Sequence, residues 1–198
     1  MLVISPCLCK SQSTKFQVGI EGGPSLSVIR YDEFLNHDTY SDIGLFYTIG
    51  AAFQYNMNNK LSIKTNLSFE RKGYQNTSGS FHYRFEYLVL PVLLKVNFGK
   101  KNWAFTNFGP YIGYLISQSI KFNNYVYKGN DSPYKKIDLG LTFGIGANIP
   151  IYNQLGLTIE LRDNLGLMNI EIGTEDQTYT NSTVIQFGIV YNFKKTNK

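Results

Sequence analysis

Apolar and polar positions alternate along residues 43–55. The odd positions, from Ile43 to Tyr55, are apolar or aromatic, and the even positions between them, from Gly44 to Gln54, are mostly small or polar. A period of two is typical of a β-strand with one apolar face. Because the same period returns in segment after segment, the sequence predicts an all-β chain.

The pattern predicts eight strands and two kinds of connection. The strands lie near residues 15–26, 42–55, 60–72, 81–98, 103–116, 137–149, 155–167 and 182–193. Short turns near 56–59, 99–102 and 150–154 alternate with longer polar segments at 27–41, 73–80, 117–136 and 168–181. This alternation is typical of transmembrane barrels with short periplasmic turns and long extracellular loops. The prediction is an eight-stranded antiparallel up-and-down transmembrane β-barrel, with both termini on the short-turn side.

Composition favours strands over helices as the membrane-crossing elements. Of the 198 residues 17% are charged, and no stretch approaches the roughly 20 unbroken apolar residues of a spanning helix. If the chain crosses a membrane, it must do so as strands. The net charge of +5 comes from lysines scattered over turns, loops and tail, without a basic stripe interleaved with stacking aromatics. Lipid headgroups are therefore expected as partners, and nucleic acid is not.

The two faces of each strand predict which side meets lipid. Odd positions in 61–69, 137–149 and 155–161 are largely bulky and apolar, whereas the even positions carry glycines, hydroxyls, amides and single charges. We assign the bulky rows to lipid and the other rows to a lumen that side chains fill. Four charges are expected inside the lumen as a structural network in which carboxylate and cation pair, because an isolated buried charge is costly. They are Glu70, Lys95, Glu160 and Arg162.

Segment 81–98 breaks this regularity. Apolar side chains occupy odd positions up to Tyr87 and even positions from Leu88 onward, which predicts a bulge near residues 87–89. Pro91 then needs a position where the ladder misses no donor. Aromatic residues near strand ends are expected to form girdles at the lipid interface. These residues are Tyr87, Trp103, Tyr111, Tyr114, Tyr191 and Phe193.

The first residues differ in character from the rest. Residues 1–11 resemble the end of a secretory signal peptide, and cleavage after Ser11 would leave residues 12–198 as a single barrel domain without cysteine. A lipid anchor on Cys7 is the alternative. A disulfide between Cys7 and Cys9 is not expected, because one intervening residue strains the bridge.

Several segments, in this order and spacing, resemble the PorT-like outer-membrane β-barrel proteins common in Bacteroidota. They are FERKG at 69–73, YLVLPVLLK at 87–95, GPYIGYL at 109–115, DLG at 138–140 before GIG at 144–146, and GIVYNF at 188–193. The resemblance covers nearly the whole chain after residue 11. It implies a location in the bacterial outer membrane, insertion by the barrel assembly machinery, and a closing strand that ends in an aromatic residue, here Phe193. The family's frequent acidic residue two places before the strand-four proline is Val89 here.

The founding member of that family is similar to a component needed for protein secretion. The resemblance therefore implies a structural or interaction role through extracellular loops or periplasmic turns, with an accessory part in protein secretion or envelope assembly. No enzyme activity, cofactor or metal is expected, since the chain has no CxxC or His-x-x-x-His spacing and no nucleophile motif.

Three alternatives stay open. A lipid-modifying enzyme could use His37 beside Asp38, or His82 near Ser78 and Ser80, at the extracellular rim. A soluble lipocalin-like barrel would have the same period but would turn its apolar rows inward around a ligand. Loop acids could contact calcium or the counter-ions of lipopolysaccharide; these acids are Glu171, Glu175 and Asp176.

Overall fold

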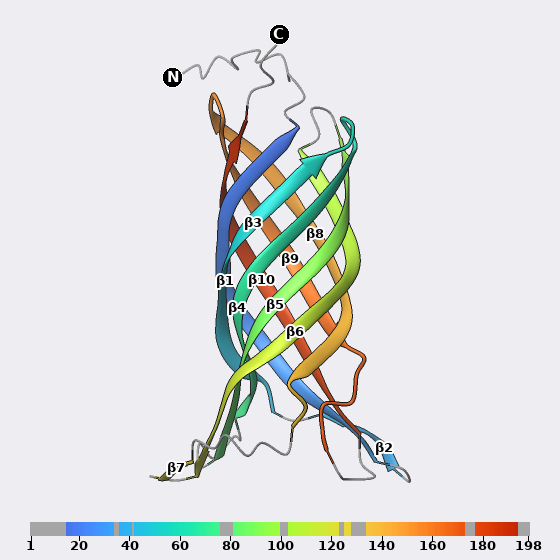
Figure 1. The fold of residues 1–198 in the computed structure, drawn as a ribbon, viewed down its shortest axis with the longest axis vertical. Helices are drawn as coiled ribbons and strands as arrows, with labels where there is room; N and C mark the ends of the chain where they lie inside the picture. The colour runs from blue at the N-terminus through green and yellow to red at the C-terminus, as the bar shows by residue number, and fades with distance from the viewer. Residues whose placement is uncertain are drawn as a thin grey trace, which may run out of the picture.

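A computed structural model describes residues 15–33, 36–40, 42–75, 81–99, 103–122, 125–127, 134–172 and 177–193. The described chain forms one antiparallel β-sheet that closes on itself (Figure 1). Each wall strand pairs with the next wall strand in the chain, and the last pairs with the first. This confirms the predicted eight-stranded antiparallel up-and-down barrel. In the described part, no helix is long and apolar enough to cross a membrane.

Eight long strands build the wall. They are β1 (Phe16–Glu33), β3 (Gly44–Asn56), β4 (Leu61–Gln75), β5 (Phe81–Phe98), β6 (Ala104–Phe122), β8 (Ile137–Tyr152), β9 (Leu155–Gly166) and β10 (Gln177–Asn192). Two short strands, β2 (Asn36–Tyr40) and β7 (Tyr125–Tyr127), pair with β1 and β6 respectively. Figure 1 shows the start of β1 and the end of β10 at one end of the barrel and β2 and β7 at the other. We call these the short-turn end and the loop end.

The strand register sets the tilt of the strands. A path of directly paired residues starts at Tyr55 on β3 and returns to β3 at Leu45, ten residues away. It passes through Ile63, Leu94, Phe108, Phe143, Asp163, Thr183 and Leu26. With ordinary strand spacings, a shift of about ten residues over eight strands tilts the strands by about 40°. Each residue then advances about 2.5 Å through the membrane.

Several strands continue into segments predicted to be loops. β1 extends to Glu33, β4 to Gln75 and β6 to Phe122, and β10 begins at Gln177. The predicted loop boundaries were wrong because they followed the end of apolar alternation. Polar strands can continue beyond lipid, since ladder hydrogen bonds satisfy their backbone groups as well as water does.

The predicted change of the apolar face from odd to even positions within segment 81–98 is also wrong. Odd positions of β5 face inward along most of the strand, from Phe85 through Tyr87 to Asn97. A register shift does occur beside Tyr87, but its extra residue is Ile116 on β6, because Glu86 pairs with Ser117 and Tyr87 with Leu115. As expected for a proline, Pro91 lies at a gap in the β4–β5 ladder, where no paired residues occur between Thr65–Val92 and Ser68–Val89.

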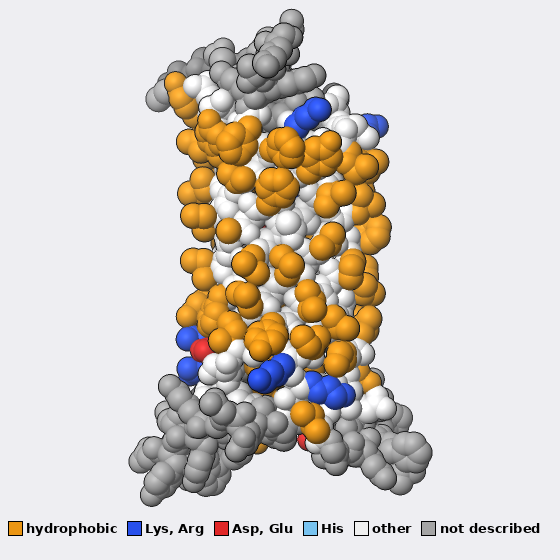
Figure 2. Space-filling view, viewed as in Figure 1, with side chains coloured by type: hydrophobic (Ala, Val, Ile, Leu, Met, Phe, Trp, Pro, Cys, Tyr) orange, Lys and Arg blue, Asp and Glu red, His pale blue; other side chains and the backbone are white. Residues whose placement is uncertain are grey.

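The outer surface carries the bulky rows. In β3 the odd positions are exposed and the even positions are buried or half-buried, and β4, β8 and β9 follow the assignment made from sequence. Figure 2 shows orange apolar side chains distributed between the two ends, with blue side chains near both ends and red ones near the lower, loop end. The lipocalin-like alternative is therefore wrong for this chain, because its apolar rows do not enclose a cavity.

Candidate functional site in the barrel lumen

Four charged side chains form a cluster in the half of the lumen nearer the short-turn end. Lys64 on β4 lies 2.6 Å from Glu21 Oε1 on β1 and 2.9 Å from Glu160 Oε2 on β9. The Nε of Arg162 lies 2.6 Å from Glu160 Oε1, and its Nη2 lies 3.8 Å from Glu21 Oε2. Two acids and two bases from three strands thus span the lumen, which offsets part of the cost of burying them.

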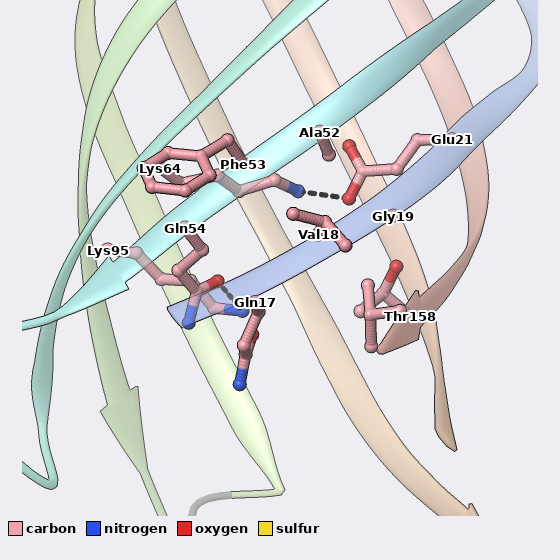
Figure 3. A pocket seen from close by; sticks show the side chains of 11 residues that line it. Gln17, Val18, Gly19, Glu21, Ala52, Phe53, Gln54, Lys64, Lys95 and Thr158 are labelled. Atoms are coloured by element: carbon pink, nitrogen blue, oxygen red, sulfur yellow. Dashed lines mark hydrogen bonds and ion pairs between the residues drawn. The ribbon is translucent and has the colours of Figure 1, made fainter. Parts of the chain in front are cut away.

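A lysine lies on the short-turn side of this cluster. The Lys95 ammonium donates to Gln54 Oε1 at 3.1 Å and to Asn148 Oδ1 at 3.0 Å. It also lies 3.9 Å from the centroid of the Phe105 ring. Figure 3 shows Lys95 and Gln54 pointing toward each other, near the pair formed by Lys64 and Glu21. Amide oxygens and an aromatic face stabilise this buried cation in place of a direct carboxylate contact.

An acid without a direct cation contact lies on the loop side of the cluster. Glu70 on β4 accepts hydrogen bonds from Asn164 Nδ2, at 3.2 and 3.3 Å, and from the Ser182 hydroxyl. Thr142 in turn donates to Asn164 Oδ1 at 2.8 Å. Four strands therefore supply one hydrogen-bonded layer that crosses the lumen.

A second ion pair lies nearer the loop end. Lys72 Nζ lies 3.1 Å from Asp138 Oδ2 and donates to Thr180 Oγ1 at 3.2 Å. Tyr111 and Thr180 both donate to the same carboxylate oxygen, at 3.1 and 2.7 Å. Both ionised side chains are fully buried, so this network joins β4, β6, β8 and β10 across the interior.

Aromatic side chains fill the lumen beyond this pair. Phe85 and Tyr87 belong to a buried apolar cluster, against which three half-buried tyrosines pack. Tyr134 packs edge-on against Phe85, with ring centroids 4.8 Å apart, and Tyr74 stacks on Tyr83 at 4.9 Å. We call this set the aromatic plug; its members are Ile29, Tyr74, Tyr83, Phe85, Tyr87, Val89, Tyr111, Leu115 and Tyr134.

Two segments between strands cover the plug. Residue Tyr134 forms an isolated bridge with Glu171, and the Lys135 amide donates to the Ile170 carbonyl at 2.6 Å. Ile170 is fully buried. Burial raises the pKa of the Tyr134 hydroxyl, and the nearby Tyr83 and Glu171 raise it further. The hydroxyl therefore stays protonated in the range where a free tyrosine ionises.

The buried charges of the described barrel balance. They are the acids Glu21, Glu70, Asp138 and Glu160 and the bases Lys64, Lys72, Lys95 and Arg162. Two small cavities, about 10 Å³ each, lie among the described lumen residues. One lies beside Lys95 and Glu21, and the other beside Glu70 and Gln186. A polar cavity of that size suits a single bound water rather than an organic ligand.

All four charges expected inside lie in the lumen, but their pairing differs from the expectation. Glu160 and Arg162 contact each other, whereas Lys95 and Glu70 are held by neutral side chains. The expected list omitted Glu21, Lys64, Lys72 and Asp138. Lys64, Lys72 and Asp138 could have been found from the sequence, because they occupy the inward even positions of their strands.

The predicted membership of the aromatic girdle is partly wrong. Tyr87 and Tyr111 are 0% and 2% exposed and belong to the plug, because their odd positions face inward on β5 and β6. The other four lie on the outer surface: Trp103, Tyr114, Tyr191 and Phe193. Tyr191 and Phe193 pack edge-on at 5.1 Å near the short-turn end.

Some sequence predictions lie outside what the structure describes. These are residues 1–11, Ser78, Ser80, Glu175 and Asp176, and the side chains of His37, Asp38 and His82. Among the described residues, no group of His, Cys, Asp or Glu could hold a metal ion.

A closed barrel with a lipid-facing apolar surface and a charged, filled lumen defines a transmembrane β-barrel protein. The profile of the outer membrane protein beta-barrel domain family matches residues 10–171. The chain therefore belongs to this family and is a protein of the bacterial outer membrane, where such barrels lie in the lipid bilayer after insertion by assembly machinery. A search of curated protein sequences gives no match.

Solved outer-membrane proteins share the fold. The outer membrane protein AlkL, determined in lipid bilayers, aligns with a TM-score of 0.58 at 12% identity, covering 100% of this chain and 99% of AlkL. OprG of Pseudomonas aeruginosa aligns at 0.54 and 10% identity, and Neisserial surface protein A at 0.52 and 12%. Each of these two covers 91% of this chain and 98% of its own. At such identities the likeness concerns the fold.

Proposed function

We propose that this protein is a non-conducting outer-membrane barrel with a structural or interaction role through its extracellular segments. The observation that carries the proposal is the filled lumen. Successive layers of ion pairs and hydrogen bonds cross it, and the aromatic plug closes its loop end. Moving a hydrated ion through would require breaking several buried ion pairs, each of which is costly to separate.

Reconstitution into planar bilayers and sugar-loaded liposomes tests the closed lumen. We expect conductance and sugar efflux equal to those of protein-free membranes, with an open porin as the positive control. Stable single-channel steps from heat-modifiable, folded protein would contradict the proposal.

The interaction role is tested separately in intact cells with a membrane-impermeant crosslinker. We expect surface adducts that disappear when residues 123–133 are replaced by a short Gly/Ser turn, while the barrel stays folded. A turn of the same length in place of residues 57–60, at the short-turn end, is the matched control and should leave the adducts unchanged. Adducts that survive the first replacement, or no adducts with the natural sequence, would contradict this role.

We further propose that the protein is PorT-like and of the Bacteroidota type, accessory to protein secretion or envelope assembly, and enters the membrane after removal of a signal peptide. The sequence segments that resemble this group support the proposal. A non-enzymatic role belongs to the same proposal. The buried acids of the described part all contact cations, amides or hydroxyls inside the lumen, away from a rim where a lipid substrate would be reached.

A further inference from the structure

A cavity of about 10 Å³ inside the lumen touches two of the polar groups described above. Arg162, on its lining, belongs to the cluster of four charges, and Glu70 belongs to the hydrogen-bonded layer on the loop side of that cluster. Apolar parts of the lining come from Val89, Pro91 and Val184. Such a volume holds about one water molecule, and a stable water site also needs polar partners.

Two polar atoms of side chains that line the cavity make no hydrogen bond within the described chain. They are Nη2 of Arg162 and Oε1 of Gln186, and the two residues are only 4% and 2% exposed. The contact of Nη2 with Glu21 Oε2, at 3.8 Å, is too long for a hydrogen bond. One atom is a donor and the other an acceptor, and each is costly to bury unpaired. A ligand that both accepts and donates hydrogen bonds satisfies both.

Glu70 offers a third partner on the same lining. Its Oε1 accepts from Asn164 Nδ2 and from the Ser182 hydroxyl, whereas its Oε2 accepts from Asn164 alone among the described residues. An ionised carboxylate has about four acceptor sites, so Oε2 can accept a further hydrogen bond. A water that donates to Glu70 and Gln186 and accepts from Arg162 makes three hydrogen bonds. Three is the usual number for a buried water.

The charges around the cavity favour a neutral ligand over an ion. The buried acids and bases of the described barrel are equal in number. An added ion would leave an uncompensated charge in the lumen, which is costly. In addition, Arg162 repels a cation and Glu70 repels an anion. Water is neutral and supplies both the donors and the acceptor that the lining requires.

We propose that one buried water molecule occupies this cavity and bridges the two polar groups of the lumen. It accepts a hydrogen bond from Arg162 Nη2 and donates to Glu70 and Gln186. Glu70, which has no direct cation contact, is thereby linked to a guanidinium through a single water. The ion pairs near the short-turn end and the layer around Glu70 then form one continuous polar network.

Crystals of the purified full-length protein, grown in the presence of rubidium bromide, test the identity of the ligand. We expect electron density for one atom within hydrogen-bond distance of Arg162 Nη2, Gln186 Oε1 and Glu70, without an anomalous signal. An anomalous peak from rubidium or bromide at this position would assign the site to an ion and overturn the proposal. Absence of density there would overturn it as well.

Oxygen-17 relaxation dispersion, which counts long-lived internal waters, tests the site in detergent micelles. Gln186→Met removes the acceptor at similar side-chain length, so we expect one long-lived water fewer than in the natural sequence. Gln154→Met is the matched control, because Gln154 lies in the turn between β8 and β9, lines neither cavity, and accepts a hydrogen bond from the Tyr191 hydroxyl at 2.9 Å. The control should leave the count unchanged.

Heat-modifiability on gels confirms that each variant is folded. If Gln186→Met does not fold, Val184→Ile takes its place, because the added methylene narrows the same cavity and should displace the same water. A folded cavity variant with the same count as the natural sequence overturns the proposal.

Discussion

Lys64 is the side chain that holds two lumen acids together. It contacts Glu21 and Glu160 directly and is itself almost fully buried. Replacing it with leucine leaves both carboxylates with only Arg162 nearby. We expect Lys64→Leu to lower the free energy of unfolding by about 3–5 kcal/mol, the usual result of removing one partner of a buried pair.

Urea titration in lipid vesicles, followed by Trp103 fluorescence, measures this effect. Lys60→Leu is the control, because Lys60 is an exposed lysine in the turn between β3 and β4. Equal stability of the two variants would show that the lumen cluster contributes little.

Two glycines of the wall allow a second test, of how tightly the wall is packed at single positions. A Cβ at Gly140 would lie 2.1 Å from the Leu165 carbonyl oxygen and 2.5 Å from the Tyr111 ring, whereas one at Gly113 would approach nothing closer than 3.3 Å. Gly140→Ala must displace backbone, so we expect a loss of about 1–3 kcal/mol. Gly113→Ala should cost clearly less in the same urea titration. A larger loss at Gly113 would contradict the observed packing.

Single positions also show the limit of sequence reasoning. The inward row of β4 reveals Lys64 and Lys72 as lumen charges, because both share the parity of Glu70. Their partners could not be predicted, since Glu160 and Asp138 come from strands 96 and 66 residues further along. Which residues of distant strands meet across the lumen depends on the barrel register, and no local pattern encodes that register.

The strand β8 gives the clearest test of a lipid-facing row. Leu141 is an outward residue within the apolar belt, and Tyr152 is an outward residue near the short-turn end. We expect Leu141→Arg to destabilise the barrel by roughly 2–4 kcal/mol, and Tyr152→Arg by about 0–1 kcal/mol, because the cost of a charge falls toward the interface. Refolding titrations in vesicles measure both. Wild-type stability of Leu141→Arg would contradict the assignment of this face to lipid.

Alternation predicted most strands because lipid and lumen demand different side chains on the two faces. For β5 it gave the correct bounds but the wrong facing, because both faces of this strand are apolar. Leu88, Leu90 and Val92 face lipid, while Tyr87 and Leu93 face the lumen. An aromatic residue inside the barrel and one in a girdle have the same local pattern, which is why Tyr87 and Tyr111 were assigned to the wrong side.

The whole molecule is held together by closure of the sheet between β1 and β10. Its ten-residue register shift gives an eight-stranded barrel an interior that side chains fill. The number of strands and their order followed from the sequence. The aromatic plug did not, because its members come from different strands and from residue 134, and they meet only when the barrel closes.

The most direct test of this account is an accessibility scan along β10 in lipid vesicles. Single spin labels at residues 182–187, in protein with Cys7 and Cys9 replaced by serine, are exposed in turn to oxygen, which dissolves in lipid, and to a water-soluble nickel reagent. Even positions of this segment are buried and odd positions face outward. We predict that oxygen accessibility rises at every odd position and falls at every even one, while nickel accessibility stays low throughout. High oxygen accessibility at positions 182, 184 and 186, with low values at 183, 185 and 187, would contradict the account.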